Sequence, residues 1–125
     1  MRKEKKFPID LFKHGVKVIF GSEEELLASA QKDGLKEEVK ESLKGLGCFK
    51  MATFLLSTGD AIIYGKDFKH INSEYATISH EIFHAVSHVL RNVGIEHTTD
   101  TEEAYAYIIE YLTQEIFNWL SSAFP

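Results

Sequence analysis

Two long helical segments in the C-terminal half of this 125-residue chain constrain the fold more than any other feature. From about Asn72 to Val93, apolar residues recur on one side of a helical wheel. A second segment, from about Thr101 to Ser121, has the same periodicity, and only residues 94–100 separate the two. Because a short loop leaves no room for a crossover, the two helices are expected to pack as antiparallel neighbours.

The first 70 residues predict shorter elements. Runs of β-branched and aromatic residues predict three strands, at residues 16–20, 48–56 and 61–64. The last two are expected to pair as a hairpin, because turn residues lie between them. Helices are expected over 22–32, where Ser22 and Glu25 form a capping-box pattern, and over 35–44. The prediction is one α+β domain over residues 1–125, with a short antiparallel sheet on the long helices and a flexible tail at residues 1–8.

Composition excludes several classes of protein. A net charge of −5 disfavours non-specific nucleic-acid binding. Four basic residues at the start, Arg2, Lys3, Lys5 and Lys6, predict a solvated tail rather than a phosphate-binding arm. No apolar run approaches the ~20 residues that span a membrane, and no signal peptide is recognisable. The single cysteine allows no internal disulfide. These features predict a cytoplasmic protein; if it derives from a phage, the host cytoplasm or the virion also fits.

The first long helix contains an HExxH motif, His80-Glu81-Ile82-Phe83-His84. Residues four apart on a helix share a face, so both imidazoles can reach one Zn²⁺ at about 2.0–2.1 Å. Glu81 would lie beside the metal, where it can take a proton from the attacking water. The wheel places His80, Glu81 and His84 opposite the apolar stripe, which a chance match need not do.

A catalytic zinc site needs a third protein ligand. His88 is too far from His80, about 12 Å along the helix axis. Glu102 and Glu103, 18 and 19 residues past His84, lie in the first turn of the second helix. Acidic residues are also favoured there by the helix dipole and by capping boxes. On the wheel, Glu102 borders the apolar face and Glu103 points away from it, so a deep metal favours Glu102 and a metal at a groove rim favours Glu103.

An HExxH motif followed about twenty residues later by a helical glutamate resembles the gluzincin metallopeptidases. The segment Glu103-Ala104-Tyr105-Ala106, with Glu110-Tyr111-Leu112 following, resembles their glutamate helix, often NEGFAxxxEYL. The resemblance places the third ligand on Glu103, with Glu102 as the alternative. Glu102 stands where those enzymes have Asn, and the chain has no GxMEN-type segment, so aminopeptidase specificity is not implied.

Residues 72–120 also resemble small HExxH proteins encoded by phages and prophages, with their HE.FHA…EEA.AY layout. This zincin-like resemblance implies that an edge strand, placed at Ala61–Tyr64, binds an extended peptide or protein substrate by backbone pairing. A chain of this size is not expected to have a second domain that would form the other wall of a cleft. The groove should therefore be open, or be completed by a second subunit or a protein partner.

The motif and the resemblance together predict a zinc-dependent metallopeptidase. His80, His84 and Glu103 would bind Zn²⁺, and Glu81 would be the general base. Three residues near in sequence could contact the oxyanion or the substrate: Tyr107, His97 and His88. One alternative is a zinc-binding protein without catalysis, such as a phage assembly or regulatory factor. The other is an interaction domain whose motif is accidental.

Overall fold

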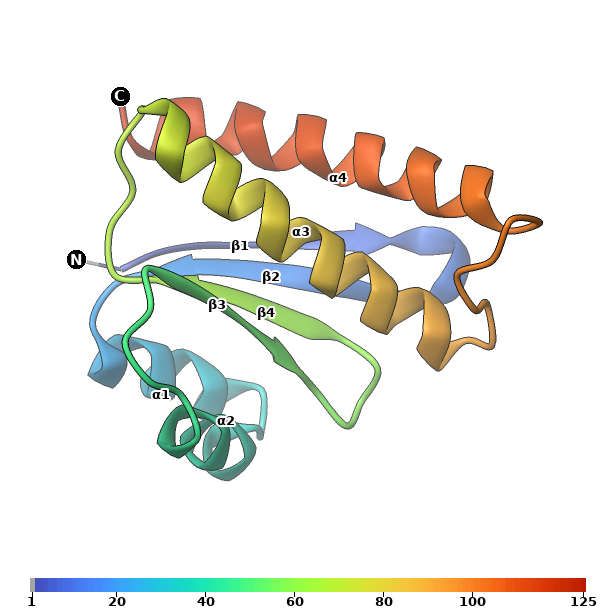
Figure 1. Ribbon diagram of the computed structural model, residues 1–125. Helices are drawn as coiled ribbons and strands as arrows, with labels where there is room; N and C mark the ends of the chain where they lie inside the picture. Colours follow the sequence, from blue (N-terminus) through green and yellow to red (C-terminus); the bar gives the residue numbers. More distant parts are fainter. Residues whose placement is uncertain (1) are drawn as a thin grey trace.

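A computed structural model describes residues 2–125 of the chain as nine elements around one four-stranded sheet (Figure 1). In chain order they are β1 (Lys3–Ile9), η1 (Asp10–Phe12, a short 3-10 helix), β2 (His14–Phe20), α1 (Glu23–Lys32), α2 (Lys36–Lys44), β3 (Met51–Leu55), β4 (Ala61–Gly65), α3 (Asn72–Asn92) and α4 (Glu102–Ala123). The chain is therefore α+β, as predicted.

The strand order is β1-β2-β4-β3. The predicted hairpin is confirmed, since β3 pairs antiparallel with β4. β2 pairs with β4 in parallel, so the sheet is mixed and the prediction of an antiparallel sheet is wrong. The placement of the edge strand at Ala61–Tyr64 is also wrong. That segment lies in β4, which has a neighbour on both sides, whereas the edge strand of this half of the sheet is β3.

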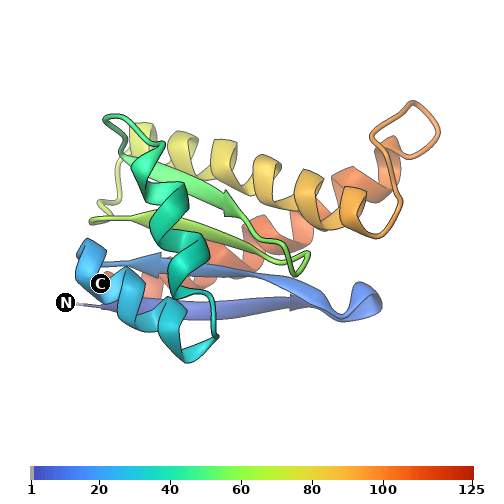
Figure 2. The ribbon, with the colours of Figure 1, turned by 90° about the horizontal axis from the view of Figure 1, so that it is seen from below.

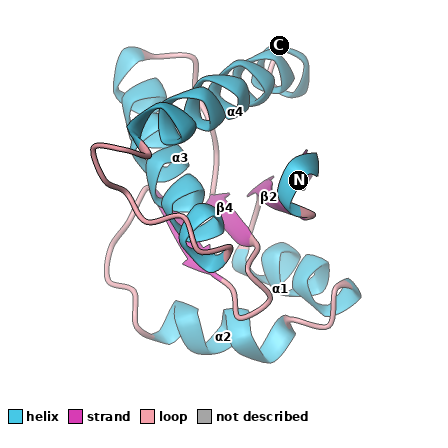
Figure 3. Cartoon of the chain, turned by 90° about the vertical axis from the view of Figure 1, so that its right-hand side faces the viewer, coloured by secondary structure: helices cyan, strands magenta, loops and turns pink. Residues whose placement is uncertain are grey.

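Helices cover both faces of the sheet (Figure 2, Figure 3). Alternate side chains of a strand point to opposite faces, and two separate apolar cores result. Val18 and Ile63 belong to the core under α3 and α4, whereas Ile19 and Ile62 belong to the core under α1 and α2. The two long helices, α3 and α4, run antiparallel over one face of the sheet (Figure 1). They contact each other at Tyr75 on α3 and Phe117 on α4, whose ring centroids are 4.9 Å apart.

The N-terminal segment differs from the prediction. The sequence predicts a flexible tail over residues 1–8, but residues 3–9 form β1, which pairs along its length with β2. Phe7 and Ile9 are buried, whereas Lys5 and Lys6 are exposed. The charged side chains and Pro8 conceal the strand pattern, although both are typical of an edge strand. The basic residues of this segment are therefore fixed on the sheet.

The helices agree with the sequence expectations to within two residues at each end. The capping box of α1 is present, with Glu25 N donating to Ser22 Oγ at 3.1 Å and Ser22 N donating to Glu25 Oε1 at 3.0 Å. Among residues 2–125, no helix has the length and apolar character needed to cross a membrane.

Candidate metal centre

The two histidines of the motif face each other on the outer surface of α3. His80 and His84 are exposed, and their Nε2 atoms are 3.0 Å apart. The ring centroids are 4.7 Å apart, with the rings nearly perpendicular. The four-residue spacing places both imidazoles on one helix face, one turn apart. The structure thus brings together the pair that the sequence predicts.

The separation of these two nitrogens suits a shared zinc ion. Two nitrogens bound at about 2.0–2.1 Å in a tetrahedral site lie roughly 3.3 Å apart. The Nε2 atoms of His80 and His84 are already within a few tenths of an ångström of that value, at 3.0 Å. Imidazole nitrogen is also a preferred zinc donor. Two of the required ligands therefore fit the ion.

Glu81 lies beside this pair but on the sheet side of it. Glu81 is only 8% exposed, and its Oε1 accepts a hydrogen bond from Thr53 Oγ1 at 2.7 Å. The other carboxylate oxygen, Oε2, is 4.0 Å from His80 Nε2. One oxygen is thus held by the sheet, while the other is next to the imidazoles. The sequence places Glu81 on the polar face of the helix; the structure places it at the border of that face, against β3.

Thr53 is a site residue that the sequence analysis missed. It lies in the middle of the edge strand β3, and its hydroxyl is also 3.3 Å from the Glu81 carbonyl oxygen. No local signal marks it, because a threonine in a strand is typical of strands in general. Only the packing of α3 over β3 reveals that this hydroxyl meets the glutamate of the motif.

The structure does not bring Glu102 or Glu103 together with the histidines. Both are exposed in the first turn of α4. Within residues 2–125, no group of three or more His, Cys, Asp or Glu side chains is arranged to hold a metal ion. The third ligand stays a prediction.

The three further candidates have different surroundings. His88 is half-buried, and its Nε2 donates to the Leu56 carbonyl oxygen at 3.0 Å. His97 is exposed in the loop after α3, with its ring 6.4 Å from that of Phe83. Tyr107 is 65% exposed on α4. His97 thus lies near the motif, at the Phe83 ring.

Tyr105 fixes the loop that carries His97. Its ring is buried and lies 4.8 Å from the His97 ring, and its hydroxyl donates to the Ile95 carbonyl oxygen at 2.6 Å. Burial raises the pKa of this phenol, so the hydroxyl keeps the proton that it donates. The loop is therefore tied to the beginning of α4, next to Glu102 and Glu103.

No family model, no curated protein and no solved structure matches the chain. The assignment of a chemistry to this site consequently depends on the residues of α3 and on their geometry.

Proposed function

We propose that the chain is a zinc-dependent metallopeptidase. The observation that carries the proposal is the arrangement of three side chains on α3: His80 and His84 have their Nε2 atoms 3.0 Å apart, and the buried Glu81 carboxylate lies next to them. Glu103, or Glu102 in its place, would supply the third ligand. A bound zinc would activate water for attack on a peptide carbonyl.

The role of Glu81 follows from its position. A general base must be within reach of the proton that it takes. Oε2 of Glu81 is 4.0 Å from His80 Nε2, whereas Oε1 is engaged by Thr53. Oε2 would accept the proton of the attacking water and later pass it to the leaving amine. A purely structural zinc site has no use for a buried carboxylate at this place, which favours catalysis over the non-catalytic alternative.

The edge strand β3 offers a place for the substrate. Within residues 2–125 it pairs only with β4, so its other edge is open to backbone pairing with an extended peptide. Thr53 in this strand contacts Glu81. A peptide lying along β3 would therefore pass the general base.

The test is Glu81→Gln in chains loaded with zinc. We expect about one zinc per chain in both the variant and the wild type, measured by elemental mass spectrometry. Hydrolysis of a mixed peptide pool, followed by mass spectrometry, should fall about 10²–10⁴-fold because the general base is lost. Glu115→Gln is the matched control: Glu115 is exposed on α4, outside the motif, and this variant should hydrolyse like wild type.

Two results would contradict the proposal. A Glu81→Gln variant that cleaves peptides as fast as wild type would exclude Glu81 as the general base. A wild-type chain that binds zinc tightly and cleaves no peptide in the pool would favour the non-catalytic zinc protein.

A further inference from the structure

The exposed face of α3 carries no charged side chain over four turns. Charged residues make up 26% of the chain, yet residues 75–90 contain only one, Glu81, and it is buried. A helix face that meets only water is usually lined by charged and polar residues. The exposed residues of this stretch are instead small, apolar or imidazole side chains: Ala76, Ser79, His80, Phe83 and His84. A second protein surface can therefore cover this face without burying an unpaired charge.

The histidine pair lies in the middle of this face. The His80 side chain is 69% exposed, and the Nε2 atoms of His80 and His84 are 3.0 Å apart. Phe83 is 43% exposed, with its ring centroid 6.0 Å from that of His84. Both imidazoles are thus reachable from outside the chain, next to an apolar ring that a second copy would cover.

The arrangement on α3 supplies half of a zinc coordination sphere. A structural zinc is almost always bound by four ligands in a tetrahedron. Within residues 2–125, no group of three or more His, Cys, Asp or Glu side chains is arranged to hold a metal ion. Two imidazole nitrogens define one edge of the tetrahedron, and a two-fold rotation exchanges that edge with the opposite one. A second copy related by a two-fold axis, the commonest symmetry of oligomers, therefore supplies the two other ligands.

Glu81 provides the charge balance for such a shared ion. Four neutral imidazoles leave the two positive charges of zinc uncompensated. In each copy the buried Glu81 carboxylate has Oε2 4.0 Å from His80 Nε2, so two copies bring two negative charges close to the metal. Residues 75–90 contain no lysine or arginine that would oppose this balance. The metal can thus be covered without leaving a net charge between the two chains.

We propose that two copies of the chain share one zinc ion through His80 and His84 of each copy, as a resting form of the protein. Nitrogen then fills all four positions, whereas a catalytic zinc keeps one position open. Zinc in excess of one ion per two chains gives each copy its own metal and separates the copies by mass action. The sharing requires only that the histidine pair binds zinc; its role as a resting form rests on the proposed peptidase function.

The test is sedimentation equilibrium of the full chain with zinc sulfate at zero, one half and two equivalents per chain. Without metal we expect the mass of one 14.2 kDa chain. At half an equivalent the mass should double, and X-ray absorption should show four nitrogens at about 2.0–2.1 Å from zinc. At two equivalents the mass should return to that of one chain. Cleavage of the mixed peptide pool should be at background at half an equivalent and appear at two.

The variants separate this contact from other modes of association. His84→Ala and His80→Ala should each stay monomeric at half an equivalent, because two of the four ligands are lost. Both changes are at exposed positions, so both variants should melt like wild type without zinc. His70→Gln, at an exposed histidine outside α3, is the matched control and should dimerise like wild type. Magnesium should not cause dimerisation, because it prefers oxygen ligands.

The outcomes distinguish the shared site from the peptidase. Chains that bind zinc but stay monomeric at half an equivalent would overturn the sharing, as would a dimer that persists in both histidine variants. If such monomers cleave peptides with zinc, the peptidase proposal stands. A dimer that cleaves at its full rate would overturn the resting role. A zinc-bridged dimer whose chains cleave nothing at two equivalents would support the shared site and contradict the peptidase, and chains that bind no zinc would contradict both.

Discussion

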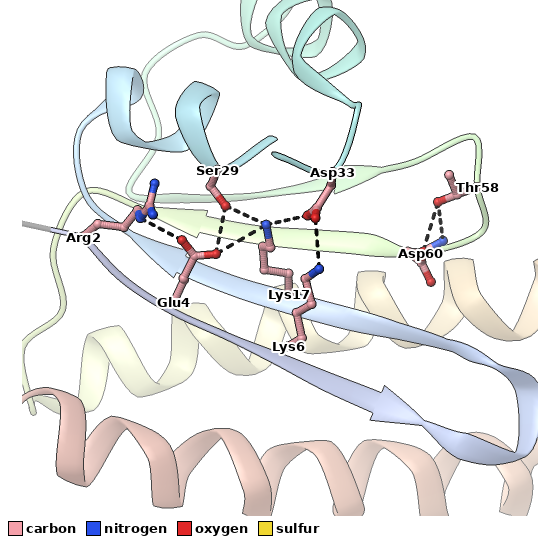
Figure 4. Close-up of polar contacts among 8 residues, drawn as sticks. All are labelled: Arg2, Glu4, Lys6, Lys17, Ser29, Asp33, Thr58 and Asp60. Atoms are coloured by element: carbon pink, nitrogen blue, oxygen red, sulfur yellow. Dashed lines mark hydrogen bonds and ion pairs between the residues drawn. The ribbon is translucent and has the colours of Figure 1, made fainter. Parts of the chain in front are cut away.

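The two faces of the sheet carry polar clusters with opposite characters. On the α3 face, His80 and His84 are exposed with their Nε2 atoms facing each other, and the adjacent Glu81 carboxylate has one oxygen held by Thr53. On the α1 face, the buried side chains of Lys17 and Ser29 hold the carboxylates of Glu4 and Asp33 (Figure 4). The first arrangement offers donor atoms for a cation, whereas in the second the acids already pair with cations of the chain itself.

This difference shows how burial decides what a polar group can do. A buried side chain such as Lys17 must be paired, because an unpaired charge in the interior is costly. Among residues 2–125, no buried side-chain nitrogen or oxygen lacks a hydrogen-bond partner. His80 and His84 are under no such requirement, because water can solvate them. Groups that are exposed yet held in a fixed geometry are therefore better candidates for ligand binding than the buried ones.

The largest expected effect concerns the third zinc ligand that is proposed for the site on α3. If Glu103 completes the site, Glu103→Gln should lower zinc affinity about 100-fold or more, because a charged ligand is lost, and Glu102→Gln should change it little. Isothermal titration with Zn²⁺ in a competing chelator measures both. The reverse pattern would assign the ligand to Glu102, and equal affinities in the two variants and wild type would contradict both assignments.

A smaller effect is expected on the α1 face. Asp33→Asn leaves the buried Lys17 without its closest carboxylate, which is 2.7 Å away. We expect a loss of about 1–3 kcal/mol in the free energy of unfolding at pH 7. Urea unfolding measures this loss. Asp67→Asn, at an exposed position in the loop before α3, is the matched control and should cost little.

The pH dependence of the Asp33→Asn effect has a definite sign. The pKa of Asp33 is lowered in the folded chain, chiefly by its hydrogen bond from Lys17. Its contribution is therefore fully present above the unfolded carboxyl pKa of about 3.9, and it is lost as the pH falls through the lower folded value. The stability difference between wild type and variant should shrink in acid. A difference that stays constant below pH 4 would contradict the pairing.

The sequence predicts the parts of the molecule that have a local periodic signal. The two long helices, the capping box of α1 and the β3–β4 hairpin all follow from such signals. The motif on α3 likewise predicts that His80 and His84 meet, because four residues make about one helical turn. These features depend only on residues close together in the chain.

Features set by long-range pairing could not be predicted. The sequence of β1 resembles a tail because its Lys and Glu residues hide the alternation, and only its pairing with β2 makes it a strand. The parallel β2–β4 contact, which puts β4 inside the sheet, has no signal in either segment. The contact of Thr53 with Glu81, 28 residues apart, arises only when α3 packs over β3.

That contact gives the smallest predicted effect. Thr53→Val keeps the shape of the side chain but removes the hydroxyl that donates to Glu81 Oε1 at 2.7 Å. Zinc binding should be unchanged, because Thr53 does not touch the histidines, while kcat for peptide hydrolysis should fall roughly threefold to tenfold, as expected for one hydrogen bond. Thr53→Ser restores the donor and should restore kcat. If Thr53→Ser and Thr53→Val lower kcat by the same factor, the Thr53 hydroxyl does not position the general base. β3 would then contribute to the site only through its backbone.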